Sequence, residues 1–180
     1  PVNDNDNPGV TDYSKFQKDI IYWYYLRKLR DIGVEDYILT SWSPPAWMKG
    51  NLSLNYMMAG VENYCDATDN KLEYHYYDEF AEMVVAFCKV FKEEMGIELT
   101  GFGMQNEPAF HEPYASAILD PAHFVKLIKV VYPKLQAEGL HTKLFMPEQA
   151  FGQTNNSMAA YIDALQADTT ANTMCSVIAT

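Results

Sequence analysis

Residues 76–104 read YYDEFAEMVVAFCKVFKEEMGIELTGFGM, and this stretch decides the fold class. Its apolar side chains recur every three or four residues, which predicts an amphipathic helix. Gly96 is placed to end that helix, because glycine readily adopts the left-handed conformation that closes a helix. Residues 97–104 then read as a short apolar strand. The stretch therefore predicts one helix followed directly by one buried strand.

The same unit of helix, glycine and strand occurs on both sides of this stretch. Asp120 is the predicted N-cap of the next helix, and Pro121 suits its first turn. Gly139 is expected to end that helix. The remaining elements are predicted as a helix over 12–32 ending at Gly33, a strand over 37–40, a strand over 143–146, a weaker helix over 158–165 and a strand beginning at 175.

Helices that alternate with short apolar strands indicate parallel βαβ units, because a parallel connection must cross over the sheet. The fold class is therefore α/β. Periodicity alone does not separate a doubly wound sheet from a barrel, but no glycine-rich phosphate loop follows any strand, which weakens the nucleotide-binding alternatives. In barrels the chemistry lies just past the carboxyl ends of the strands, so those positions are the ones to inspect.

Composition excludes several partners and cofactors. The chain of 180 residues has 13 Lys and Arg against 24 Asp and Glu, a formal charge of −11, and its basic residues are scattered, so we expect no nucleic-acid partner. No apolar run is long enough for a membrane span, and we expect no membrane insertion. Cys65, Cys88 and Cys175 form no CxxC pair, and the histidines lack paired metal spacing, so we expect no metal or other cofactor. The oligomeric state stays open.

A rigid aromatic loop follows the first predicted strand. Residues 41–49 read SWSPPAWMK, and two prolines prevent them from continuing a central strand. One interpretation is structural: the prolines end the strand, and Trp42 and Trp47 pack under the following loop. The other is functional: the two tryptophans form a wall on which sugar rings stack at the rim of a cleft.

A carboxylate follows the second strand, in the sequence Gln105-Asn106-Glu107-Pro108. The leaving oxygen of a glycoside needs a proton as its bond breaks, and a carboxylic acid in a partly desolvated cleft supplies one. Glu107 is therefore the candidate catalytic acid, and Asn106 is a candidate partner of the sugar 2-hydroxyl. Glu148, after the third strand, is expected to give an accessory contact, and His111 to line the cleft.

The strings 41–49 and 105–108 together resemble glycoside hydrolase family 30, a family of clan A with a (β/α)₈ TIM barrel. The resemblance implies that residues 1–180 are a fragment of a single catalytic barrel domain. The fragment would hold about strands 3 to 6 with the intervening helices, an incomplete barrel. It also implies a secreted, periplasmic or cell-surface protein that acts on a carbohydrate substrate.

The family's chemistry is retaining hydrolysis of a β-linked polysaccharide or glycoside. The resemblance implies that Glu107 is the acid/base and that the nucleophile is a second glutamate, on strand seven, outside this chain. The two carboxyl groups of a retaining enzyme stand about 5 Å apart. The fragment alone is therefore expected to be inactive, and the sugar and linkage are not specified.

Two other functions remain open. A non-catalytic carbohydrate-binding relative would keep the aromatic cleft without hydrolysing sugar, although it would have no need of Glu107. An unrelated α/β domain would use the Trp and Pro loop structurally and bind no sugar. Half a barrel also leaves open sheet edges, so we expect the segment to be marginal or aggregation-prone by itself.

Overall fold

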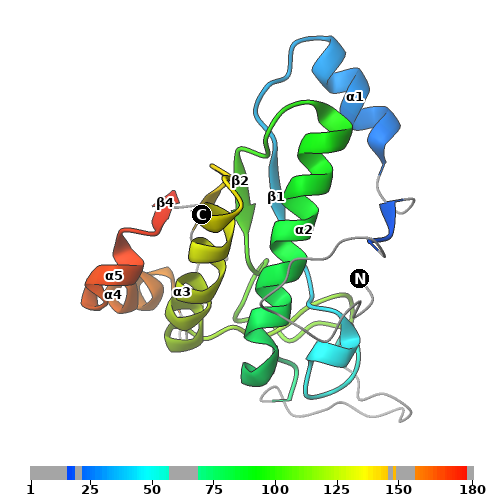
Figure 1. The fold of residues 1–180 in the computed structure, drawn as a ribbon. Coiled ribbons are helices and arrows are strands. Elements are labelled where there is room, and N and C mark those ends of the chain that lie inside the picture. Colours follow the sequence, from blue (N-terminus) through cyan, green and yellow to red (C-terminus); the bar gives the residue numbers. More distant parts are fainter. Residues whose placement is uncertain (1–15, 19–21, 57–68, 146–147, 149–156, 178–180) are drawn as a thin grey trace.

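The computed structural model describes residues 16–18, 22–56, 69–145, 148 and 157–177. In these residues four short strands form one parallel sheet, in the order β1-β2-β3-β4 (Figure 1). The strands are β1 (Ile38–Thr40), β2 (Gly101–Gly103), β3 (Lys143–Phe145) and β4 (Cys175–Val177). Their spatial order follows their chain order, so the strand reversal that defines a doubly wound sheet is absent from this part of the chain.

The helices follow the expected alternation with the strands. α2 and α3 lie side by side against the sheet (Figure 1). The described helices are α1 (Trp23–Asp31), α2 (Tyr77–Met95), α3 (Pro121–Ala137), α4 (Met158–Ala167) and α5 (Thr169–Asn172), with short 3-10 helices η2 (Ala46–Met48) and η3 (Tyr74–Tyr76). The prediction of helix and strand order along the chain is confirmed in these residues.

The two faces of the sheet differ in their side chains. Leu39, Phe102 and Leu144, one from each of β1, β2 and β3, pack into the apolar core that the helices share. Thr40 and Phe145 lie on the other face, where a Cβ on Gly103 would meet both of them at 2.8 Å. Successive side chains along each strand point to opposite faces of the sheet, so one face packs on the helices and the other is an inner face. On the inner face, Phe145 occupies the space beside Gly103.

The predicted helix ends are confirmed at three glycine and aspartate positions. Gly96 has φ 71° and its N–H donates to the Lys92 carbonyl at 2.9 Å, which closes α2. Gly139 has φ 66° just beyond α3. The Asp120 side chain accepts from the His123 N–H at 3.0 Å, as an N-cap does. These bonds satisfy backbone groups that the helix itself leaves without partners.

The first helix is shorter than predicted. A helix over 12–32 was expected, but α1 begins at Trp23, and residues 16, 17 and 22 are not helical. The indole N–H of Trp23 donates to the Lys18 carbonyl at 3.0 Å, which draws the preceding chain back over the start of the helix. Residues 1–15, where the predicted start falls, lie outside the described part. Residue 146, the last of the strand predicted over 143–146, also lies outside the described part. So does any part of the last predicted strand beyond residue 177.

Candidate active site

The carboxyl ends of β1, β2 and β3 bring together the three segments that were predicted to carry chemistry. The Asn106 N–H donates to the Ser41 carbonyl at 2.8 Å, which joins the end of β2 to the end of β1. Asn106 also forms a parallel bridge with Glu148, just beyond β3. Parallel strands end at the same edge of a sheet, and this edge is where barrel enzymes place their reacting groups.

Glu107 has an unusual backbone conformation. It is half-buried, and its φ of 41° is positive although it has a Cβ. Its N–H donates to the Glu148 carbonyl at 3.2 Å, and its own carbonyl accepts from the Phe110 N–H at 2.9 Å. Such a conformation costs about 1–3 kcal/mol and persists only where surrounding bonds fix it, most often at functional sites.

Gln105 is a site residue to which the sequence analysis gave no role. Its side chain is 2% exposed, and its Nε2 donates to the Trp42 carbonyl at 2.8 Å and the Asn106 carbonyl at 2.9 Å. One amide group therefore links the loop after β1 to the peptide that precedes Glu107. The available signal was an amide directly after an apolar strand, because a buried amide must find hydrogen-bond partners.

Trp42 forms an exposed aromatic pair with Tyr114, a second residue that the sequence analysis did not single out. Trp42 is 51% exposed and Tyr114 is 46% exposed, and their ring centroids lie 6.0 Å apart in an edge-to-face arrangement. Loss of solvent, followed by the negative charges of Glu112 and Glu107, raises the pKa of the Tyr114 phenol.

Trp47 occupies a different environment from Trp42. It lies on η2, half-buried, with its ring 5.2 Å from that of Tyr76 in an edge-to-face contact. It also packs against the apolar core. These contacts agree with the structural interpretation of this tryptophan, and its substrate-binding role stays a prediction.

A buried lysine holds the loops around the site. Lys49 is 1% exposed, and its Nζ donates to the Ser43 hydroxyl at 3.1 Å, the Leu54 carbonyl at 3.1 Å and the Ser116 carbonyl at 2.7 Å. These partners belong to three separate stretches of irregular chain. A buried ammonium that satisfies three oxygen atoms fixes the loops relative to one another.

His111 joins this polar cluster through Asn70. The Nδ1 of His111 lies 3.0 Å from the Nδ2 of Asn70, whose Oδ1 accepts from Asn51. An amide nitrogen can only donate, so Nδ1 accepts and the proton of the neutral ring lies on Nε2. Tyr56 contacts the His111 ring at 5.5 Å between centroids. The structure thus places His111 on the 109–119 loop, held by residues beneath it.

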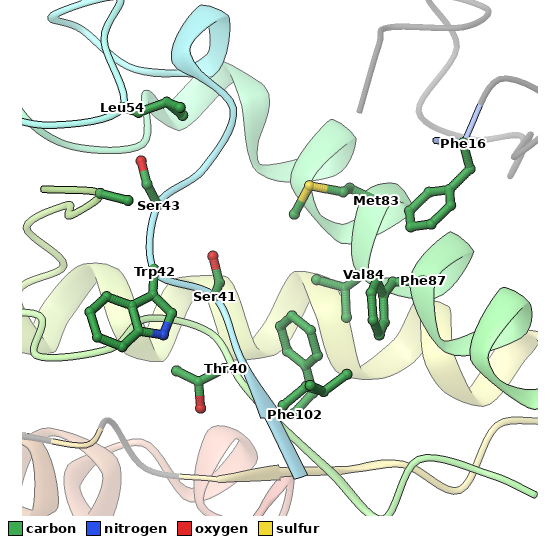
Figure 2. Close-up of a pocket in the computed structure, with 12 residues that line it drawn as sticks. Phe16, Thr40, Ser41, Trp42, Ser43, Leu54, Met83, Val84, Phe87 and Phe102 are labelled. Atoms are coloured by element: carbon green, nitrogen blue, oxygen red, sulfur yellow. The ribbon is translucent and has the colours of Figure 1, made fainter. Parts of the chain in front are cut away.

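A cavity lies beside β1 and α2, and the predicted catalytic residue is not among the residues that line it. It has a volume of about 440 Å³. Figure 2 shows Met83, Val84 and Phe87 of α2 on one side of the β1 chain and Trp42 on the other. Because the α2 side is apolar, this space suits side-chain packing better than recognition of a hydroxyl-rich sugar.

The part of the chain that the structure describes offers no metal centre and no membrane span. In it, no group of three or more His, Cys, Asp or Glu side chains could hold a metal ion. None of the described helices is long and apolar enough to cross a membrane. Cys88 is a buried free thiol and Cys175 is half-buried, while Cys65 lies outside the described residues.

Comparison with solved structures identifies the fold. The catalytic domain of the family 30 xylanase C from Talaromyces cellulolyticus matches with a TM-score of 0.67 and 22% identity, over 86% of this chain and 34% of the xylanase. A subfamily 8 xylanase of glycoside hydrolase family 30 from Clostridium acetobutylicum matches with a TM-score of 0.70 and 23% identity, over 98% of this chain and 40% of that one.

An endo-β1,6-glucanase also matches, with a TM-score of 0.70 and 22% identity, over 88% of this chain and 34% of the glucanase. The sequence matches no protein-family model, and the search of curated proteins found no match. The chain spans between about a third and two fifths of these solved structures. It therefore has the fold of part of a TIM barrel, as the sequence predicted.

Proposed function

We propose that this chain forms part of a retaining glycoside hydrolase that acts on a β-linked polysaccharide or glycoside, with Glu107 as its general acid and base. The observation that carries the proposal is the position of Glu107. It follows the carboxyl end of a barrel strand, in a positive-φ conformation that is accompanied by backbone bonds to Glu148, just beyond β3, and to Phe110. The fold supports it, because the matched structures include xylanases and a glucanase.

The proposed reaction has two steps. First, the Glu107 carboxylic acid donates its proton to the glycosidic oxygen while a second carboxylate attacks the anomeric carbon, so that the leaving group departs and a glycosyl-enzyme forms. Then the Glu107 carboxylate takes a proton from a water molecule. The oxygen of that water attacks the anomeric carbon and releases the second carboxylate. We assign that second carboxylate to a segment of a longer protein outside these 180 residues, so the chain alone would be inactive.

Other residues of the edge would bind the sugar. Asn106 is adjacent to the acid and is assigned to the sugar 2-hydroxyl, where contacts strengthen in the transition state. Trp42 offers an exposed ring for stacking, while Trp47 and His111 are assigned to the cleft on the sequence argument. Glu148 is likewise assigned an accessory contact on the sequence argument, and its backbone carbonyl accepts from the Glu107 N–H.

The expected place of action is outside the cytoplasm, in a secreted, periplasmic or cell-surface protein. The resemblance to family 30 and the acidic composition, with a formal charge of −11, support this assignment. The substrate would be a carbohydrate polymer or glycoside with β-linked sugars.

The test uses the full-length protein that contains this chain, with Glu107→Gln and the matched control Glu112→Gln from the loop after it. Cleavage of β-linked xylan, glucan and galactan is measured for each. We expect Glu107→Gln to lose about 1,000-fold in rate, because proton transfer by a positioned acid contributes that much. Glu112→Gln should keep most of the activity.

Three results would contradict the proposal. Binding of the sugars without cleavage by the unaltered protein would favour a non-catalytic carbohydrate-binding relative. Absence of both binding and cleavage would favour an unrelated α/β domain. An equal loss in both variants would show that activity has no specific dependence on the Glu107 carboxyl group.

A further inference from the structure

We propose that Gln105 is a positioning residue whose side-chain amide fixes the peptide group between Asn106 and Glu107 and thereby aims the Glu107 carboxyl. This inference rests on the proposed function, since it assigns Gln105 a role through the acid. It goes beyond that function, because Gln105 itself touches neither the substrate nor the reacting atoms.

The peptide group between Asn106 and Glu107 is held at both ends. Its carbonyl oxygen accepts from the Gln105 Nε2 at 2.9 Å. Its N–H donates to the Glu148 carbonyl at 3.2 Å. The two partners come from different parts of the sheet edge, so the plane of the peptide group cannot rotate without breaking both bonds.

This restraint on the peptide group holds the unfavourable backbone conformation of Glu107. Rotation of the peptide group changes the φ of Glu107, which is 41° and unfavourable for a residue with a Cβ. Without the bond from Gln105, rotation to a negative φ would relieve the strain and turn the Cα–Cβ bond of Glu107. A displacement of about 1 Å at a reacting group can cost about 100-fold in rate.

The same amide also positions the aromatic loop. The second N–H of Gln105 Nε2 lies 2.8 Å from the Trp42 carbonyl, at the base of the exposed ring. Since Gln105 is 2% exposed, water has little access to replace either bond. One side chain therefore sets the acid and the stacking ring relative to each other.

The test is Gln105→Met in the full-length protein, because methionine fills a similar volume and donates no hydrogen bond. The value of kcat/KM is measured on an alkyl β-glycoside, which needs a proton on its leaving oxygen, and on a 2,4-dinitrophenyl β-glycoside, which does not. We expect a loss of about 100-fold on the alkyl glycoside and less than about 5-fold on the dinitrophenyl glycoside. Simple destabilisation would lower both values equally.

Gln136→Met is the matched control, since Gln136 also donates through Nε2 to a backbone carbonyl, that of Leu140 at 3.2 Å, but at the end of α3. We expect it to change neither kcat/KM. Equal losses on the two substrates in Gln105→Met, or no loss on either, would overturn the inference. If Gln105→Met does not fold, Gln105→Leu takes its place with the same expected pair of values, because leucine also donates no hydrogen bond to either carbonyl.

Glu107→Gln, measured on the same two substrates, separates this inference from the proposed function. A selective loss on the alkyl glycoside in Glu107→Gln but not in Gln105→Met overturns the role of Gln105 alone. Absence of a selective loss in Glu107→Gln means that the proposed function fails, and the role of Gln105 fails with it.

Discussion

At the residue scale, Gln105, Asn106 and Glu107, which follow β2 and Met104, serve the same edge of the sheet in different ways. Gln105 is buried and bonds to two backbone carbonyls, whereas Asn106 and Glu107 are half-buried. The identity of these residues was evident in the sequence, since they follow an apolar strand. The positive φ of Glu107 was not, because it depends on a bond to Glu148, far along the chain.

We expect Trp42→Ala in the full-length protein to raise KM about tenfold and to leave kcat within about threefold. The exposed ring would lose stacking worth about 1–1.5 kcal/mol, equal in the ground and transition states. Steady-state kinetics on a soluble β-glucan or xylan measures both constants. The same measurement on Trp47→Ala decides whether that partly core-packed ring binds sugar, and an unchanged KM in Trp42→Ala would remove it from the cleft.

Lys49→Met should lower the free energy of unfolding by about 3 kcal/mol. The buried carbonyl oxygen of Ser116 would lose its lysine donor, and an unsatisfied buried acceptor costs about 1–3 kcal/mol, whereas the Leu54 carbonyl would keep the Ser116 N–H as a donor. Urea unfolding followed by circular dichroism measures the change. The control is Lys92→Met. The Lys92 side chain is 50% exposed and pairs with Glu98, so its loss should change the free energy of unfolding by less than about 1 kcal/mol. Equal effects would show that Lys49 does not hold the loops.

At the element scale, the sequence predicted the long elements better than the short ones. The apolar spacing of α2 and the N-cap Asp120 are local signals, and the structure confirms both. A strand was predicted over 97–104, but β2 occupies only three of these residues. Strand length depends on hydrogen-bond partners from β1 and β3, which the local sequence does not show. The loops around the site escaped prediction because bonds such as that from Lys49 to Ser116 span distant segments.

Gly96→Ala should destabilise the chain by about 1 kcal/mol. The cause is the left-handed φ of 71°, since a Cβ there meets no atom within 4 Å. Gly96→Asn should cost less, because asparagine tolerates this conformation better. Thermal unfolding of the two variants is the measurement, and an Asn variant less stable than the Ala variant would refute the conformational explanation.

Asp168 should make stability depend on pH at the end of α4. A hydrogen bond from Lys129, followed by one from the Ala171 N–H, lowers its pKa below the ordinary value of about 3.9. A lowered pKa in the folded state stabilises the fold above about pH 4, and the contribution is lost as pH falls through the folded-state pKa. Asp168→Asn keeps the cap but not the charge, so it should unfold more readily at pH 7 and differ less from the unaltered chain at pH 2.

Urea unfolding at pH 7, 4 and 2 checks this expectation. Lys129→Met should reproduce the effect, because it removes the first partner of the same carboxylate. A difference between Asp168→Asn and the unaltered chain that stays constant across the three pH values would rule out titration of Asp168.

At the scale of the whole molecule, the consecutive parallel sheet and the helices packed on it match part of a TIM barrel. The sequence predicted this α/β class from the repeated helix and strand units, and the motifs 41–49 and 105–108 predicted the barrel. The 440 Å³ cavity beside β1 was not predictable, since its lining comes from segments far apart in the chain, among them Phe16, Phe87 and Ala115. The aggregation expected of half a barrel stays a prediction.

The most direct test of the central claim is azide rescue of Glu107→Ala in the full-length protein, with a dinitrophenyl β-glycoside as substrate. The glycosyl-enzyme forms without an acid, and azide needs no general base to attack it. We predict slow hydrolysis without azide, and with azide a restored turnover that yields the β-glycosyl azide with retained configuration. A product of inverted configuration would make Glu107 the nucleophile instead, and unchanged hydrolysis without azide would remove it from the chemistry.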